Sequence, residues 1–408
     1  MLKIISLVGA RPNFIKLAPF VHAINKHNEG GGQYVEHILV HTGQHYDDRM
    51  SQTFFEQLNI PQADINLGVG SGSHAQQVGQ TMIEFEKVLQ QHKPHWVVVV
   101  GDVNATLAGS VTAKKEWVKC CHIEAGLRSG DITMPEEVNR LVTDRLSDLL
   151  LTPDTLSSEN LRKEGTPEDR IVFVGNIMID TLEANRGKAK EMSIHSIITA
   201  NQINQSVVTL SCDALSVVEG SKGNHPITQS GNQSILKDDH YAVITLHRPS
   251  NVDHKEVLEP LVQFLLEEVT RDYTLIWPIH PRARKQLESF GLYEKVCSNP
   301  NLILLEPIGY LEMLRLNMGA KVMLTDSGGL QEECTILGTP CLTLRWNTER
   351  PITLTEHGGA SILVGNNVAR IREEYRIAVS KTRNPVRPEL WDGHAAERCL
   401  EAILSYKG

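Results

Sequence analysis

The chain contains 408 residues, more than one ordinary hydrophobic core accommodates, and this length predicts two domains. Hydrophobic residues make up 41% of the sequence and charged residues 22%, proportions typical of a soluble globular protein. The formal net charge is −9, whereas a nucleic-acid-binding surface needs clustered Lys and Arg in excess. We therefore expect no nucleic-acid partner, and an anionic ligand would have to be held by a few well-placed cations.

The cysteines and the N-terminal sequence indicate a cytoplasmic protein. The seven cysteines are scattered and lack the spacing of a metal site, so we expect reduced thiols and no bound metal. The first residues form a short strand-like run without the basic start and the cleavage site of a signal peptide. No apolar run approaches the ~20 residues that a membrane-spanning helix requires, so we expect no membrane partner.

Short apolar runs alternate with longer amphipathic stretches in the first half of the chain. The run Val97–Val100 is apolar on both faces, as a central strand of a parallel sheet should be. This alternation predicts a doubly wound α/β domain. The predicted strands are Leu2–Val8, His37–Val40, Trp96–Val100, Lys119–Ile123, Leu149–Thr152 and Ile171–Val174. The predicted helices are Ile15–His27, His74–Gln91, Thr106–Trp117 and Glu136–Ser147.

The same alternation resumes after residue 240 and predicts a second α/β domain of similar size. Its predicted strands are Tyr241–Leu246, Tyr273–Ile279, Leu302–Leu305, Lys321–Thr325, Cys341–Arg345 and Ser361–Val364. The segment Ile197–Leu236 is rich in Ser, Asn, Gln and Gly, which favours a tolerated surface insertion over a functional flap. The stretch Pro388–Tyr406 is predicted to be helical. The domains that follow are residues 1–185, residues 186–387 and a C-terminal helix over residues 388–408.

The turn after the first strand carries two cations. The sequence 9–16 lacks the GxGxxG pattern, so a dinucleotide-binding fingerprint is absent. Arg11 and Lys16 instead flank the start of the first helix, where the helix dipole adds to their attraction for a phosphate. Considered alone, the two residues are more simply explained as surface cations beside a turn.

Three carboxylates follow neighbouring elements of the first domain. Asp102 follows one predicted strand, Glu124 follows the next, and Glu136 begins the helix after that. Open α/β sheets bind ligands at the carboxyl ends of their strands, so the three side chains could converge on one crevice. Each one alone is explained by a turn, a cap or a helix N-terminal acid. Together they are candidate catalytic residues, because like charges need a reason to gather.

Two strand ends of the second domain carry groups that suit a nucleotide. His247 and Arg248 follow one strand, and this histidine could donate to a phosphate oxygen or transfer a proton, although an isolated histidine is more often buried and satisfied. The sequence Ser327-Gly328-Gly329 follows another strand and opens a helix, whose N–H groups are unshielded at the glycines and suit a phosphate. Glu333, one turn further, is placed to accept hydrogen bonds from ribose hydroxyls. An ordinary strand–turn–helix connection explains the local motif equally well.

These segments, taken in order, resemble the non-hydrolysing UDP-N-acetylglucosamine (UDP-GlcNAc) 2-epimerase family. The matching segments are 9–16, 42–45, 101–102, 122–128, 135–140, 247–248, 278–281, 326–333 and 348–351. The resemblance implies a glycosyltransferase-B-like fold, in which two Rossmann-type domains face each other across a cleft and the last helix crosses back to the first domain. It also implies a homodimer that uses no metal and no nicotinamide cofactor.

The resemblance further implies a reaction and a set of site residues. The family inverts carbon 2 of UDP-GlcNAc to give UDP-N-acetylmannosamine (UDP-ManNAc), by anti elimination of UDP to a 2-acetamidoglucal and re-addition, and it supplies cell-surface polysaccharide synthesis. The implied catalytic residues are Asp102, Glu124, Glu136 and His247. The implied UDP-binding residues are Arg11, Lys16, His247, Arg248, Ser327, Gly328, Gly329 and Glu333.

Some features depart from the family pattern and leave alternatives open. Ile352 stands where many relatives carry Glu, the polar segment before residue 236 is longer than usual, and residues 68–74 differ from the region that binds an activating second UDP-sugar in allosteric members. The substrate could be another UDP-2-acetamido sugar, such as a UDP-2,3-diacetamido-uronic acid. A glycosyltransferase of the same fold is disfavoured because it has no obvious use for the three carboxylates. A non-catalytic UDP-sugar sensor is the alternative from a different functional class.

Overall fold

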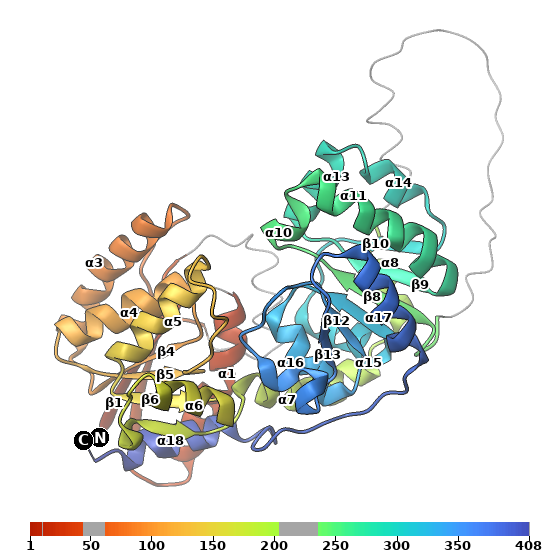
Figure 1. Ribbon diagram of the computed structural model, residues 1–408. Coiled ribbons are helices and arrows are strands. Elements are labelled where there is room, and N and C mark those ends of the chain that lie inside the picture. The colour runs from red at the N-terminus through yellow and green to blue at the C-terminus, as the bar shows by residue number, and fades with distance from the viewer. Residues whose placement is uncertain (10, 44–61, 204–235, 408) are drawn as a thin grey trace. The chain divides into compact units, whose positions relative to one another are not determined.

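The computed structural model describes residues 1–9, 11–43, 62–203 and 236–407, and it divides into two compact units (Figure 1). Unit 1 comprises Met1–Gly187, Asn347–Gly359 and Pro385–Gly408. Unit 2 comprises Lys188–Trp346 and Ala360–Asn384. The segment 347–359 thus belongs to unit 1, although its neighbours on both sides in the sequence belong to unit 2. In the part of the chain that is described, no helix is both long and apolar enough to cross a membrane.

Unit 1 is built on a seven-stranded parallel sheet with the order β3-β2-β1-β4-β5-β6-β7. The order reverses between β1 and β4, which creates the topological switch point at which doubly wound sheets bind their ligands. Strand β4 is buried at all five residues, as its apolar sequence predicts. The strands are β1 (Leu2–Val8), β2 (Val35–His41), β3 (Ile65–Asn66), β4 (Trp96–Val100), β5 (Lys119–Ile123), β6 (Leu149–Thr152) and β7 (Ile171–Phe173).

The helices of unit 1 form layers on the sheet. Right-handed crossovers place α1, which connects β1 to β2, and α4, which connects β4 to β5, on opposite faces. Helix α4 packs against α3 and α5, while α1 packs against the C-terminal helix α18 (Figure 1). The helices are α1 (Arg11–Glu29), α3 (His74–His92), α4 (Asn104–Lys115), α5 (Pro135–Leu146), α6 (Thr155–Lys163), η1 (Glu168–Arg170), α7 (Ile177–Glu191) and α18 (Ala395–Ser405), and the short helices η4 (Pro351–Thr353) and η5 (Thr355–His357) lie in segment 347–359.

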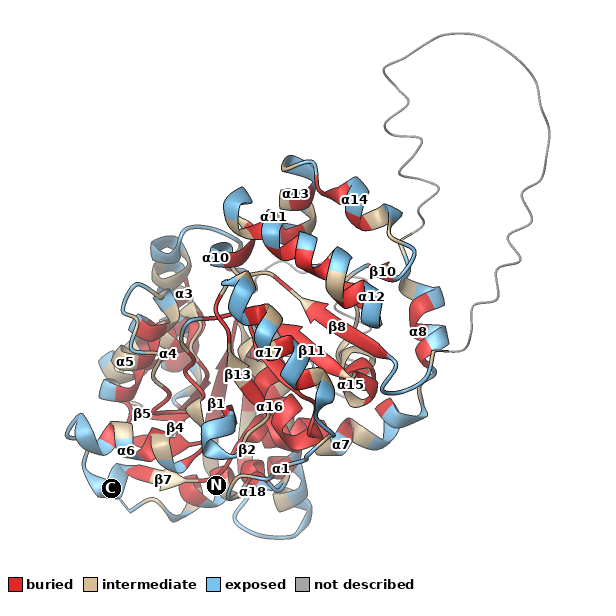
Figure 2. Ribbon diagram, turned by 45° about the vertical axis from the view of Figure 1, so that its right-hand side comes forward, coloured by how far each residue is buried: buried red, intermediate tan, exposed pale blue. Residues whose placement is uncertain are grey.

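Unit 2 repeats the Rossmann plan with six parallel strands in the order β10-β9-β8-β11-β12-β13. Its central strands β8 and β11 are buried over most of their length (Figure 2). Trp277 lies in the core with Tyr375. The strands are β8 (Tyr241–Thr245), β9 (Thr274–Pro278), β10 (Leu302–Leu305), β11 (Val322–Thr325), β12 (Cys341–Thr343) and β13 (Ser361–Leu363). The helices are α8 (Ile194–Asn201), α10 (Pro249–Val252), α11 (Lys255–Phe264), η3 (Leu265–Val269), α12 (Thr270–Asp272), α13 (Pro281–Ser289), α14 (Tyr293–Ser298), α15 (Tyr310–Gly319), α16 (Gly328–Leu337) and α17 (Val368–Ser380).

Two predictions about local structure are wrong. The C-terminal helix begins at Ala395 instead of Pro388, because Leu390 and Gly393 have φ of +58° and +86° and break the helix. The predicted surface insertion 197–236 begins inside helix α8, whose Ile197 and Ile198 are buried in the core of unit 2. The remainder of that insertion, residues 204–235, lies outside the described residues.

Candidate active site

The three carboxylates lie at the carboxyl edge of the sheet of unit 1. Asp102 follows β4, Glu124 follows β5, and Glu136 lies in the first turn of α5. Glu124 has a φ of +75°, a conformation that costs a residue with a side chain on the order of 1 kcal/mol or more. The turn is held because the N–H groups of Glu124 and Ala125 both donate to the Leu151 carbonyl, at 3.0 Å each.

Glu124 is buried between two cations. Lys16, from α1, donates to one carboxylate oxygen, and Arg350 Nη2 donates to the other at 2.9 Å. The pair with Lys16 lies directly over Gly101, where a Cβ atom would be 3.2 Å from both Glu124 Oε2 and Lys16 Nζ. Glycine is therefore favoured at this position, both by the limited space above it and by its φ of +68°. The two cations fix the orientation of the Glu124 side chain.

Asp102 is also ionised. Arg140 Nη2, from α5, donates to Asp102 Oδ2 at 2.5 Å, and Arg140 Nη1 donates to Glu137 at 2.8 Å. Burial alone would raise the pKa of Asp102, but the positive charges of Arg140, Lys16 and Arg350 together lower it. Asp102 is therefore an anion at neutral pH, the form that accepts a proton.

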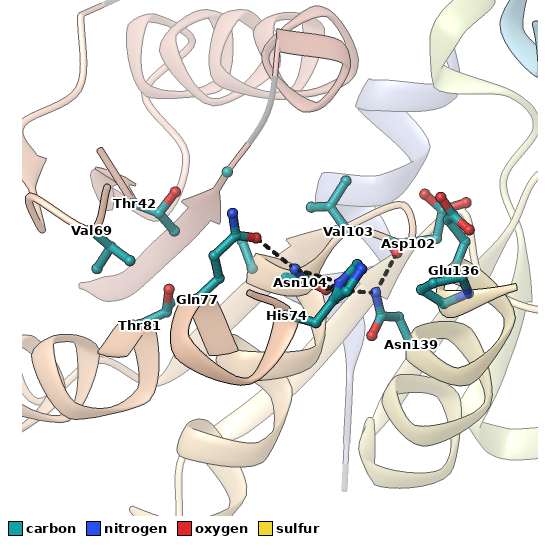
Figure 3. Close-up of a pocket in the computed structure, with 13 residues that line it drawn as sticks. Thr42, Val69, His74, Gln77, Thr81, Asp102, Val103, Asn104, Glu136 and Asn139 are labelled. Carbon is teal, nitrogen blue, oxygen red and sulfur yellow. Dashed lines mark hydrogen bonds between the residues drawn. The ribbon is translucent and has the colours of Figure 1, made fainter. Parts of the chain in front are cut away.

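Glu136 differs from the other two carboxylates in its surroundings. Within the described part of the chain, its side chain forms no hydrogen bond and no salt bridge. It lines a cavity of about 270 Å³ together with Asp102 (Figure 3). The other lining residues are Gly9, Thr42, Val69, His74, Gln77, Thr81, Val103, Asn104, Ala105, Pro135 and Asn139. Two carboxylates in different environments thus face one cavity, an arrangement that suits a pair of proton-transfer groups.

Neutral amides contribute to the polar part of this cavity wall. Asn139 Nδ2 donates to the Asp102 carbonyl at 2.8 Å, and Asn104 Nδ2 donates to Gln77 Oε1 at 2.7 Å (Figure 3). His74 lies on the other side of Asn104, with 3.1 Å between His74 Nδ1 and Asn104 Nδ2. These hydrogen bonds connect α3, α4 and α5 across the cavity and fix the orientation of its amide groups.

His122, in a segment that matches the family, supports the strand ends. Its Nδ1 lies 2.6 Å from Asp144 Oδ1, and its Nε2 lies 2.8 Å from the Gly101 carbonyl. Asp144 also accepts from the Gly126 N–H at 3.0 Å and from Arg128 Nη1 at 2.7 Å. His122 therefore joins the turn after β4 to the turn after β5, and it positions the backbone that carries the carboxylates.

In unit 2, a buried aspartate organises the loop after β8. Asp326 is fully buried and accepts from the backbone N–H groups of His247, at 3.0 Å, and Arg248, at 2.9 Å. Its second oxygen lies 2.7 Å from His247 Nδ1. Burial would raise the pKa of Asp326, but the hydrogen bonds from His247 and Arg248 outweigh it and lower the pKa. With its Nδ1 held by this carboxylate, the His247 ring has a fixed orientation, and its Nε2 is left to contact a ligand.

Helix α16 begins beside the same aspartate. Ser327 is the N-cap residue, its N–H donates to Thr325 Oγ1 at 3.0 Å, and its hydroxyl makes no capping bond. A Cβ atom at Gly329 would meet no atom within 4 Å, so the space over the first turn is open. The first N–H groups of a helix have no acceptor within the helix, and they attract an anion.

Glu333 lies deeper in α16 and is 4% exposed. Burial raises its pKa to about 7, with a further contribution from the negative charge of Glu332 and opposing ones from Asn317 and Tyr310. Asn317 and Tyr310 are the polar side chains that lie beside the buried Glu333 carboxylate.

The predicted site residues fall into two groups. Asp102, Glu124, Glu136 and Lys16 come together in unit 1, and Lys16 is paired with Glu124 instead of standing alone beside a turn. The group in unit 2 consists of His247, Arg248, Ser327, Gly328, Gly329 and Glu333. The side chain of Arg11 and the residues Gln44 and His45 lie outside the described residues.

Three buried charged residues of the site were not predicted. Arg140 and Arg350 are the partners of Asp102 and Glu124, and Glu349 pairs with Arg350. All three lie in segments that match the family, which is the signal that could have identified them. Their partners could not be inferred from the sequence, because Glu124 and Arg350 are separated by 226 positions.

Comparisons with known proteins agree with this geometry. A family model described as UDP-N-acetylglucosamine 2-epimerase matches residues 28–404. The chain is 40% identical over 406 residues to a UDP-N-acetylglucosamine 2-epimerase of Methanocaldococcus jannaschii, covering 99% of both chains. It is 35% identical over 404 residues to a UDP-2,3-diacetamido-2,3-dideoxy-D-glucuronate 2-epimerase of Pseudomonas aeruginosa, covering 98% of this chain and 99% of the relative.

A solved structure extends the match to the fold. The crystal structure of M. jannaschii UDP-GlcNAc 2-epimerase in complex with UDP-GlcNAc and UDP matches with a TM-score of 0.81 at 39% identity, covering 100% of both chains. Together with the two Rossmann-like sheets, this match confirms the predicted glycosyltransferase-B-like α/β class. The chain therefore belongs to the UDP-N-acetylglucosamine 2-epimerase family and is an enzyme of the isomerase class.

Proposed function

We propose that this enzyme interconverts UDP-GlcNAc and UDP-ManNAc without net hydrolysis. The observation that carries the proposal is the cavity of unit 1, where Asp102 is held ionised by Arg140 and faces Glu136, which has no ion-pair partner among the described residues. Two carboxylates with different surroundings are what proton removal from one face of a carbon and proton delivery to the other require.

The chemistry of the sugar explains why the reaction proceeds through elimination. The hydrogen on carbon 2 is not adjacent to a carbonyl group, so its removal alone would leave an unstabilised carbanion. When a base takes this proton, the electron pair instead forms a double bond between carbons 1 and 2, and the bond from carbon 1 to the diphosphate oxygen breaks. UDP leaves with that bonding pair. Re-addition of UDP, with a proton delivered to the opposite face of carbon 2, completes the inversion.

The groups of unit 2 suit the nucleotide that departs and returns. We propose that His247, Arg248, Ser327 and the first N–H groups of α16, at Gly328 and Gly329, hold the diphosphate. Charge that develops on the leaving group is stabilised by such preorganised donors. Glu333 accepts from the ribose hydroxyls. The family resemblance also assigns Arg11 and Lys16 to UDP binding.

The cavity favours a neutral sugar over a uronic acid. Besides its two carboxylates, its polar wall contains the amides of Gln77, Asn104 and Asn139, the hydroxyls of Thr42 and Thr81, and the ring of His74. The amides match hydroxyl and acetamido groups. A carboxylate on the sugar would instead add a third negative charge next to Asp102 and Glu136. The substrate of the P. aeruginosa relative is therefore the second candidate.

Turnover of UDP-GlcNAc, followed by separation of the nucleotide sugars, tests this proposal. The wild-type enzyme should form UDP-ManNAc, and it should act on UDP-2,3-diacetamido-glucuronate poorly or not at all. Asp102→Asn and Glu136→Gln should each lower kcat about 10²–10⁴-fold, because each removes a proton-transfer group and keeps its shape. Glu86→Gln, on the exposed side of α3, is the matched control and should leave kcat unchanged. Wild-type activity on the uronic acid alone would overturn the choice of sugar, and undiminished kcat in both site variants would overturn the assignment of the site.

We also propose a homodimer located in the cytoplasm. Ile83 on α3 is 54% exposed and Trp117, just after α4, is 95% exposed, and these two helices pack against each other. Exposed large apolar side chains of this kind suit contact with a second copy. Free cysteines, buried at Cys120, Cys121, Cys334, Cys341 and Cys399, suit a reducing compartment. Analytical ultracentrifugation of the wild type and of Trp117→Lys should give a dimer and a monomer, and a monomeric wild type would contradict the proposal.

A further inference from the structure

Segment 347–359 brings two charged residues to the carboxylate cluster of unit 1. The chain leaves β12 of unit 2, passes through this segment, and returns to unit 2 at β13, while the segment itself belongs to unit 1. Glu349 and Arg350 are 3% and 5% exposed, so their charges are held inside the protein. Buried charges are costly unless they are paired, and a functional reason for their placement is therefore expected.

Glu349 lies between the two arginines that hold Asp102 and Glu124. Arg350 Nη1 donates to Glu349 Oε1, while Arg350 Nη2 donates to Glu124 at 2.9 Å. On the other side, Arg140 Nη2 donates to Asp102 at 2.5 Å and lies 3.9 Å from the same Glu349 oxygen. Each arginine therefore contacts a candidate catalytic carboxylate and also lies next to Glu349. Glu349 does not line the cavity next to Asp102 and Glu136.

The charges of this cluster show what Glu349 contributes. Among the described residues, the cluster includes the cations Lys16, Arg140 and Arg350 and the carboxylates Asp102, Glu124, Glu137 and Glu349. Without Glu349 the cluster would lose one negative charge, and the positive charge of the two arginines would act more strongly on Asp102 and Glu124. In a buried cluster such a change is screened little by solvent. A carboxylate that is more tightly held by cations accepts a proton less readily.

We propose that Glu349 is a positioning residue for the epimerase reaction: it orients Arg140 and Arg350 and shares their positive charge, so that neither arginine holds its carboxylate too tightly for proton transfer. This inference rests on the proposed function. Through Glu349, segment 347–359 would influence the orientation and the charge environment of Asp102 and Glu124 without contacting the substrate.

Steady-state kinetics of Glu349→Gln with UDP-GlcNAc, and with UDP-GlcNAc deuterated at carbon 2, test the proposal. We expect kcat to fall about 10- to 100-fold, as displacement of a catalytic group does, while KM stays within about 3-fold. Because proton transfer becomes slower relative to other steps, the deuterium isotope effect on kcat should increase. Glu356→Gln is the matched control, since Glu356 lies in the same segment with its side chain 71% exposed, and it should behave as wild type.

A second variant separates charge from position. Glu349→Asp keeps the negative charge on a shorter side chain. Its kcat should be higher than that of Glu349→Gln and lower than that of the wild type. The same order is expected if Glu349→Gln folds poorly. Unchanged kcat in Glu349→Gln would overturn the inference, as would an equal loss in both variants with no change in the isotope effect. A wild-type enzyme that does not turn over UDP-GlcNAc would instead contradict the proposed function itself.

Discussion

The substitution Asp326→Asn tests how unit 2 builds its nucleotide site. Asp326 Oδ2 accepts three hydrogen bonds, from the N–H groups of His247 and Arg248 and from Asn251 Nδ2, at 3.0, 2.9 and 3.1 Å. Its Oδ1 lies 2.7 Å from His247 Nδ1. An asparagine can place its carbonyl oxygen at the position of Oδ2 and keep the three bonds. Its NH₂ group then faces His247, and the negative charge is lost.

The expected magnitude follows from these contacts. A hydrogen bond to a charged group contributes about 1.5–3 kcal/mol and a neutral one about 0.5–1.5 kcal/mol, so each of the three retained bonds loses about 1 kcal/mol. We expect the free energy of unfolding of unit 2 to fall by about 2–3 kcal/mol. His247 also loses the carboxylate that orients its ring. A misoriented His247 loses its hydrogen bond to the diphosphate, and the loss of about 1.5 kcal/mol raises the Kd for UDP about 10-fold.

Chemical denaturation and titration calorimetry with UDP at pH 7 measure both effects. Asp253→Asn is the control, because Asp253 forms a partly exposed ion pair with Arg282, and such pairs contribute about 1 kcal/mol or less. If Asp326→Asn changed neither the stability nor the UDP affinity beyond the effect of the control, the role of Asp326 as the organising residue of this loop would be refuted.

Three further predictions concern other positions. Gly101→Ala should lower kcat at least about 10-fold, because its Cβ atom would displace the buried Glu124 carboxylate; Gly130→Ala, with a similar φ of +73° but open surroundings, should not. The affinity for UDP should be highest above pH 7 and should weaken as the pH falls below 7. The raised pKa of Glu333, about 7, leaves less of the carboxylate form to accept hydrogen bonds from the ribose hydroxyls at lower pH. Calorimetry of Glu333→Gln should show no such pH dependence. Burial raises the pKa of Asp180 to about 6. The contribution of Asp180 to the free energy of unfolding is therefore fully present below its unfolded pKa, and it is lost as the pH rises from about 4 to 6. The thermal midpoint of Asp180→Asn should not follow that trend.

The sheets were predictable because parallel strands are buried on both faces. A short run that is apolar throughout, such as Trp96–Val100, is typical of a central parallel strand, and its bounds agree with the structure. The two-residue strand β3 (Ile65–Asn66) was missed, since two residues carry no periodicity. Helix α8 was not predicted, because its apolar residues Ile194, Ile197 and Ile198 lie at the start of a stretch that is otherwise polar.

The candidate site was predictable where topology determines proximity. Strand ends meet at one edge of a parallel sheet, so Asp102, Glu124 and Glu136 could be placed together from the sequence alone. The partners of these carboxylates were not predictable. Arg350 reaches Glu124 because segment 347–359 belongs to unit 1, and no local pattern marks that return. Charge pairing over such separations is decided by the tertiary fold.

Turnover of UDP-GlcNAc in deuterated water, with the products analysed by NMR, tests whether the enzyme uses the elimination–addition route. In the elimination–addition route the proton removed from one face of carbon 2 is replaced from another group on the opposite face. The UDP-ManNAc formed should therefore carry deuterium at carbon 2, with traces of UDP and 2-acetamidoglucal released as intermediates. Product that forms without solvent deuterium would contradict the elimination route, and free N-acetylmannosamine with UDP as the sole products would show a hydrolysing enzyme instead.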